Sequence, residues 1–85
     1  MREISSERKF QDVLDEAKTL ILMDVWAPWC GPCRQMEPII QELEEEYKDR
    51  LLIIKVNADD VPNLTAREGI RSLPTFIWYK DAQKV

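Results

Sequence analysis

Apolar residues with the spacing of an amphipathic helix occur in two segments of the chain. In residues 6–18 they occupy positions 10, 13, 14 and 17, which form one face of a helix with Ser5 or Ser6 near its cap. In the second segment, which begins after Cys33, the apolar face consists of Met36, Ile39, Ile40, Leu43 and Tyr47. The remainder of this second helix is polar and rich in glutamate, as expected for a surface exposed to water.

Three other segments are apolar or aromatic over the length of a strand. Leu20–Trp26 and Leu51–Val56 are almost continuously apolar, which is typical of strands covered on both faces in a parallel sheet. Thr75–Tyr79 is aromatic and β-branched and predicts a further strand, and Met1–Ile4 is expected to add a short edge strand. Asp24 is the single charge in the first run, so we expect it to be buried.

A short helix is expected between the last two long strands. Asp59 or Asp60 would cap it, Pro62 would lie in its first turn, and Gly69 would take the left-handed position after its end. The resulting order, β-α-β-α-β-α-β, is that of an α/β layered fold.

The size and composition of the chain restrict its organisation and its partners. Its 85 residues fit a single domain spanning 1–85. Twelve basic against 16 acidic residues give a net charge of −4, which argues against binding to nucleic acid or to an anionic membrane. The absence of histidine excludes every mechanism that needs an imidazole. With no secretory signal and no apolar segment long enough for a bilayer, we expect a cytoplasmic protein.

Two cysteines, Cys30 and Cys33, carry the candidate chemistry. They lie where a predicted buried strand gives way to a helix, and the free N–H groups and dipole of a helix N-terminus favour a thiolate. A structural disulfide between them would close only a very small loop, and a closed zinc site needs four ligands. A metal or iron–sulfur site shared by two copies stays open as an alternative. Because the cytosol keeps structural thiols reduced, we favour a redox-active pair.

The segment from Asp24 to Cys33, DVWAPWCGPC, resembles the active-site segment of the thioredoxin family. The similarity continues through Pro38, the Lys55-Val56-Asn57 stretch with Asp59, and GIRSLPT at 69–75, in register over nearly the whole chain. It implies a thioredoxin-like fold, with a central mixed sheet flanked by helices. It also implies a thiol–disulfide oxidoreductase that reduces protein disulfides, needs no cofactor or metal, and is re-reduced by a thioredoxin reductase.

The resemblance assigns roles to four residues. Cys30 would attack a target disulfide, and Cys33 would then attack Cys30 and release the reduced target. Asp24 would accept the proton of Cys33 through a water, because burial raises the pKa of a carboxyl group. Lys55 would interact with Asp24 and tune it. The alternative for Asp24 is a purely structural ion pair with Lys55.

Five further residues are expected to bind the substrate. Pro74 resembles the family's cis-proline, which presents the backbone of Leu73 to an extended substrate strand. Trp29, Gly31 and Pro32 would form an apolar rim for docking. A proline between the cysteines, in a chain without histidine, favours a reductase over a disulfide-forming oxidase.

The resemblance breaks at the C-terminal end. The family has a further antiparallel strand and a C-terminal helix, for which Lys80–Val85 offers no counterpart, so we expect a C-terminally shortened fold. The Asp81-Ala82 pair fits a type I′ hairpin turn poorly. A homodimer through the uncovered sheet edge is one hypothesis. A second hypothesis is a shortened binding module, or a dimer bridged by a metal cluster, that has no reductase activity.

Overall fold

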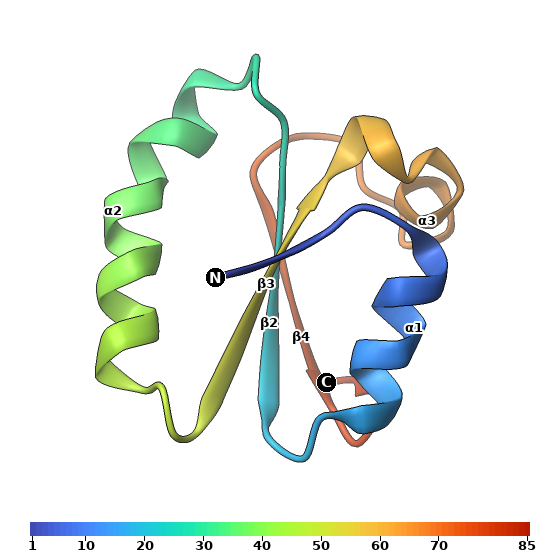
Figure 1. Ribbon diagram of the computed structural model, residues 1–85. Coiled ribbons are helices and arrows are strands. Elements are labelled where there is room, and N and C mark those ends of the chain that lie inside the picture. The colour runs from blue at the N-terminus through green and yellow to red at the C-terminus, as the bar shows by residue number, and fades with distance from the viewer.

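The computed structural model describes all 85 residues and shows a mixed five-stranded sheet with helices on both faces (Figure 1). The strands are β1 (Arg2–Ile4), β2 (Leu20–Trp26), β3 (Leu51–Asn57), β4 (Thr75–Lys80) and β5 (Gln83–Lys84). The helices are α1 (Glu7–Glu16), α2 (Gly31–Glu46) and α3 (Pro62–Arg67), with a 3₁₀ turn, η1 (Ala58–Asp60). The sheet order is β1-β3-β2-β4-β5, in which β1, β3 and β2 run parallel while β4 is antiparallel to β2 and β5 to β4. The predicted fold class is therefore confirmed.

Alternation of side chains along the strands divides the core between the two faces of the sheet. On one face, Ile21 and Met23 of β2 meet α1 and α3 in a cluster of 12 buried residues. On the other face, Leu22 joins Ile40 of α2 in a cluster of only 4 buried residues, and α2 is the sole helix there (Figure 1). Because successive strand residues point to opposite faces, Asp24 shares the α2 face with Leu22.

The short third helix begins differently from the prediction. Asp59 and Asp60 lie in the turn η1 and do not cap α3. Asn57 caps that turn, since its side chain accepts a hydrogen bond from the Asp59 N–H at 2.9 Å. Helix α3 then starts at Pro62 with no side-chain cap. Gly69 follows α3 with φ 68°, which is the predicted left-handed conformation.

The C-terminal end forms a hairpin that we did not expect. The two-residue strand β5 pairs with Tyr79 and Lys80, so the edge of β4 is covered over part of its length. Both residues of the turn have positive φ, 53° at Asp81 and 64° at Ala82. This is the backbone conformation of a type I′ turn, adopted without the glycine that usually accommodates it. The expected absence of a last strand is thus corrected to a very short one.

Replacing Ala82 by glycine should therefore stabilise the chain. The left-handed conformation costs a residue with a Cβ about 1 kcal/mol, and glycine adopts it freely. We expect the A82G variant to gain about that much in the free energy of unfolding, measured by urea denaturation. Alanine-to-glycine at exposed Ala66, inside α3, should instead destabilise the chain by a similar amount. A loss of stability in A82G would contradict the role assigned to this turn.

Glu68, at the end of α3, ties the last two strands to the helical layer. Its carboxylate accepts a hydrogen bond from the Tyr79 hydroxyl at 2.7 Å and pairs with the Lys84 ammonium at 3.0 Å. These bonds lower the pKa of Glu68 against the opposing effect of its burial. The ring of Tyr79 also packs edge-on against Phe10 of α1, with centroids 5.5 Å apart.

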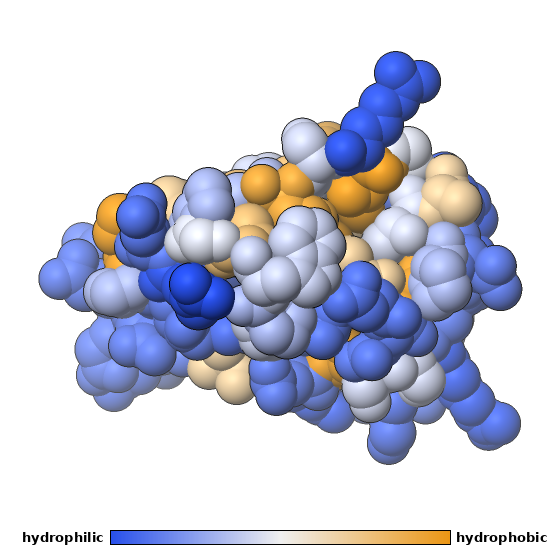
Figure 2. Space-filling view, turned by 90° about the horizontal axis from the view of Figure 1, so that it is seen from above, coloured by the Kyte–Doolittle hydropathy of each residue, from blue (hydrophilic) through white to orange (hydrophobic).

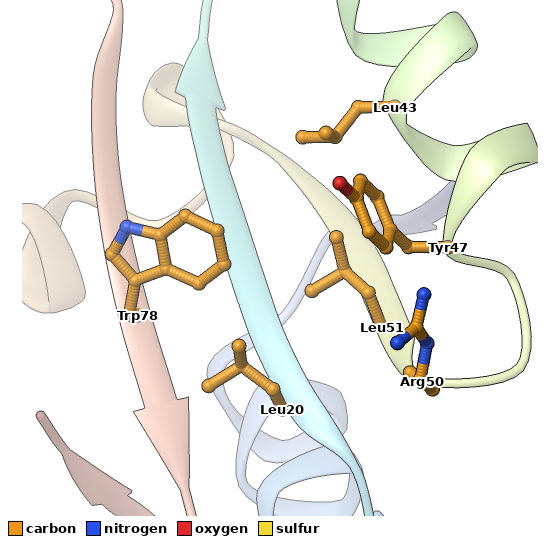
Figure 3. Close-up of a pocket in the computed structure, with 6 residues that line it drawn as sticks. All are labelled: Leu20, Leu43, Tyr47, Arg50, Leu51 and Trp78. Carbon is orange, nitrogen blue, oxygen red and sulfur yellow. The ribbon is translucent and has the colours of Figure 1, made fainter.

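An apolar hollow of about 350 Å³ lies on the α2 face of the sheet (Figure 3). Its lining residues are Leu20, Leu43, Tyr47, Arg50, Leu51 and Trp78. Trp78 of β4 is 39% exposed in this hollow. The predicted apolar face of α2 is only partly covered, because Tyr47 is 37% exposed and Ile39 is 56% exposed. No helix in the chain has the length and apolarity that crossing a membrane requires.

Candidate active site

The two cysteines lie where β2 ends and α2 begins, as the sequence predicted. Cys30 is the N-cap of α2, and its Sγ atom accepts a hydrogen bond from the backbone N–H of Cys33 at 3.2 Å. The two sulfur atoms are joined in a disulfide, and the residues are only 5% and 7% exposed. When the disulfide is reduced, the same N–H group and the positive end of the helix dipole are placed to stabilise a thiolate at Cys30.

The loop after β2 and the loop that carries Leu73 meet at the disulfide, and the turn η1 contacts the first of them through Trp29. Apolar side chains gather across the middle of this end of the molecule and are bordered by polar ones (Figure 2). Leu73 packs against the cluster that contains the cysteines, and the Leu73–Pro74 peptide bond is cis. Trp29 is 68% exposed, and its indole N–H donates to a carboxylate oxygen of Asp59 at 3.0 Å.

A groove of about 360 Å³ runs beside these loops. Trp29 and Leu73 contribute to its lining together with Ile70 and Arg71, so it is mostly apolar with one cation at the surface. Pro32 is exposed in the first turn of α2. Gly31 beside it has no atom within 4 Å of the position that a Cβ would take, so this part of the rim is open. The structure thus brings the predicted substrate-binding residues to one end of the molecule.

Asp24 is buried beneath this end, on the α2 face of β2. It is 5% exposed, and the side chains beside it in the sheet belong to Lys55 of β3 and Phe76 of β4. Burial raises the pKa of Asp24 to about 6, against the lowering effect of Lys55, while Glu37 raises it further. A carboxyl group with this pKa can exchange a proton near neutrality.

Lys55 is the Cα partner of Asp24 across the β2–β3 ladder, but its ammonium group pairs elsewhere. Its Nζ atom donates to Oε1 of Glu37 on α2 at 2.6 Å and lies 3.9 Å from the centre of the Trp26 ring. Lys55 makes no ion pair with Asp24 within 4.0 Å. The alternative in which Asp24 serves only as the partner of Lys55 in an ion pair therefore does not describe this structure.

Glu37 is the residue near the cysteines that our sequence interpretation missed. It lies four residues after Cys33, which places both side chains on the same face of α2. The helical pattern assigns the glutamates of this helix to the exposed side as a group. The four-residue spacing from Cys33 is the signal in the sequence that distinguishes Glu37 from the exposed glutamates of this helix.

The thioredoxin family model matches residues 2–85 of the chain. The chain belongs to the thioredoxin family. Thioredoxin 1 of Synechococcus elongatus is 45% identical over 75 residues, which are 88% of this chain and 69% of that protein. An M-type chloroplastic thioredoxin of Chlamydomonas reinhardtii is also 45% identical, and there the match spans only 54% of the relative. The solved structure of Plasmodium falciparum thioredoxin superposes with a TM-score of 0.92 at 33% identity, covering 100% of this chain and 81% of that one.

Family membership and the joined cysteines together establish the chemical class. This thioredoxin-family chain is a thiol–disulfide oxidoreductase, and the Cys30–Cys33 pair is its redox-active centre. The alternative of a binding module or a metal-bridged dimer is not favoured.

Proposed function

We propose that this chain reduces disulfides of other proteins, with Cys30 as the attacking thiolate and Cys33 as the resolving thiol. The observation that carries the proposal is the Cys30 Sγ atom at the N-cap of α2, where the Cys33 N–H donates to it. The Cys30 thiolate attacks one sulfur of the target, forms a mixed disulfide and releases the other sulfur as a thiolate. Cys33 then loses its proton and attacks Cys30, forming the Cys30–Cys33 disulfide and releasing the second target sulfur. Two electrons pass from the dithiol to the target.

Asp24 is the proposed proton acceptor for Cys33. Both residues are buried, so the Cys33 proton has few other acceptors. A carboxyl group with a pKa near 6 is largely ionised at neutral pH and remains a stronger base than an ordinary aspartate. A bridging water would carry the proton between them. Lys55 is the proposed tuning residue, since its positive charge lowers the pKa of Asp24.

The substrate is proposed to dock over the rim formed by Trp29, Gly31 and Pro32. Leu73 and Pro74 would present their backbone to an extended segment of the target. Because main-chain pairing does not depend on the target's side chains, such a site accepts many proteins. The apolar groove beside Leu73 supplies room for the flanking residues of that segment.

A reductase partner completes the cycle by returning the disulfide to the dithiol. We propose a thioredoxin reductase in the cytoplasm as this donor. Ferredoxin-dependent reduction is the competing route, because chloroplastic and cyanobacterial thioredoxins are among the relatives.

The proposed function is tested by following insulin reduction by the purified chain. We expect catalytic turnover with NADPH and a thioredoxin reductase, and little with a ferredoxin-dependent enzyme. A redox titration of the disulfide should give a midpoint of about −270 mV, the range of reducing thioredoxins. A midpoint of about −120 mV would indicate an oxidant and would contradict the proposed direction of electron transfer.

A homodimer is a second proposal, and it concerns assembly. The exposed part of the β4–β5 edge and the adjacent apolar hollow with Trp78 are the surfaces that a second copy would cover. Light scattering across a range of concentrations separates the two states, and a monomer at the highest concentration would eliminate the dimer.

A further inference from the structure

The ion pair between Glu37 and Lys55 connects α2 to the strand beside Asp24. Its two charged atoms are 2.6 Å apart, so they form a short, charge-assisted hydrogen bond. The Lys55 side chain is 10% exposed, whereas that of Glu37 is 38% exposed. The pair therefore holds a buried ammonium group against a partly exposed carboxylate of α2 and not against the buried Asp24.

Two contacts hold the Lys55 ammonium in this position. One is the Glu37 carboxylate, and the other is the face of the Trp26 ring at 3.9 Å, where a cation is attracted by the ring electrons. Asp24 is the neighbour of Lys55 in strand register, yet it receives neither a hydrogen bond nor an ion pair from it. The lysine is thus bound to the carboxylate on the helix and not to Asp24 beside it in the sheet.

Other charged groups near Lys55 do not compete with Glu37. Glu3 of β1 is its Cα partner on the other side, and Glu3 and Asp60 line the same cavity of about 210 Å³ as Lys55. Neither forms an ion pair with Lys55. Asp24 itself is faced by Lys55 from β3 and by Glu37 from α2, while its neighbour on β4 is the uncharged Phe76.

We propose that Glu37 is a positioning residue that holds the Lys55 ammonium on the α2 side and so prevents it from pairing with Asp24. The proposal rests on the proposed function, because its consequence is that the Asp24 carboxylate stays free to take the Cys33 proton. Without the Glu37 charge, the register neighbours of Lys55 that carry a carboxylate are Asp24 and Glu3, and Asp24 is the buried one whose pKa the lysine already lowers. A direct ion pair would make Asp24 a weaker base, because an adjacent opposite charge stabilises the ionised form.

The test is a titration of the Asp24 carboxyl carbon by NMR in the oxidised protein, where the disulfide keeps both cysteines from titrating. Asp24→Asn identifies the signal. We expect Glu37→Gln to lower the midpoint from about 6 by about one pH unit. Glu42→Gln removes the same charge from an exposed position of α2 and should leave the midpoint unchanged. Glu37→Asp keeps the charge and should retain most of the original value.

A Lys55→Met background separates positioning from the direct effect of the Glu37 charge. There Glu37→Gln should shift the Asp24 midpoint by much less, because no lysine is released. An unchanged midpoint in Glu37→Gln, or an equal shift with and without Lys55, would overturn the proposal.

The pH profile of insulin reduction tests the proposed function separately. If Asp24 is the proton acceptor, the acid limb of the profile moves with the titration in Glu37→Gln. If the titration moves and the limb does not, the role of Asp24 in proton transfer fails while the positioning role of Glu37 stands.

Discussion

Replacing Cys30 by serine should abolish disulfide reduction, with a loss of at least about 10³-fold in turnover. Serine has nearly the same shape as cysteine but supplies no thiolate at neutral pH, so the first attack cannot occur. Insulin reduction with a saturating electron donor measures the loss. Because the Cys30–Cys33 loop is so small, losing its disulfide should change the stability of the chain little.

Cys33→Ser is the matched variant, and it should behave differently. It retains the attacking thiolate and lacks the resolving thiol, so the mixed disulfide with the target should accumulate. Non-reducing electrophoresis and mass spectrometry detect that adduct. Turnover that survives in Cys30→Ser, or an adduct formed through Cys33 instead, would reverse or remove the assigned roles.

Replacing Asp24 by asparagine should stabilise the oxidised protein at neutral pH while slowing the release of the target. The folded state raises the pKa of Asp24 from 3.8 to about 6, so between these values it holds a proton that the unfolded chain has lost. The contribution of Asp24 to the free energy of unfolding therefore falls as the pH rises from about 4 to about 6. Above that range, Asp24 destabilises the folded state by its full amount. The cost is about 3 kcal/mol by linkage, of which Asp24→Asn should recover about 2 kcal/mol at pH 7.5.

Urea denaturation at two pH values isolates this effect from the other acidic groups. Near pH 4 the wild type and Asp24→Asn should be similar in stability, and at pH 7.5 the variant should be clearly more stable. If the stability of the two proteins changed by the same amount between these pH values, folding would not raise the pKa of Asp24, and the prediction would be wrong. The slower release of target is measured as a lower turnover at pH 7.5, where Asp24 of the wild type is ionised.

Local pattern was sufficient to predict four of the five strands and the places of Cys30 and Asp24 in the fold. The apolar runs at 20–26 and 51–56 predicted buried strands, and the structure confirms them as β2 and β3. The CxxC spacing after a strand placed Cys30 at a helix N-terminus, and the isolated charge in an apolar run predicted the burial of Asp24. These predictions succeed because they depend on periodicity and chain order, which can be read from the sequence without knowing any tertiary contact.

The features that we missed depend on contacts between distant segments or on turn geometry. Whether Lys55 pairs with Asp24 or with Glu37 is decided by the packing of α2 on the sheet, which strand register does not specify. Asp59 did not cap α3 because Asn57 had already started the 3₁₀ turn. The last hairpin forms despite Ala82 because its flanking contacts offset an unfavourable backbone conformation.

Glu68 connects the last two strands of the chain to the start of the loop that carries Leu73 and Pro74. Glu68 binds Tyr79 of β4 and Lys84 of β5, and the loop that leads to Leu73 and Pro74 begins immediately after Gly69. When β5 frays, Glu68 loses one of its two partners and the start of that loop loses an anchor. We therefore expect local unfolding at the end of the chain to reach the loop that carries Leu73 and Pro74, where we propose that the target backbone docks.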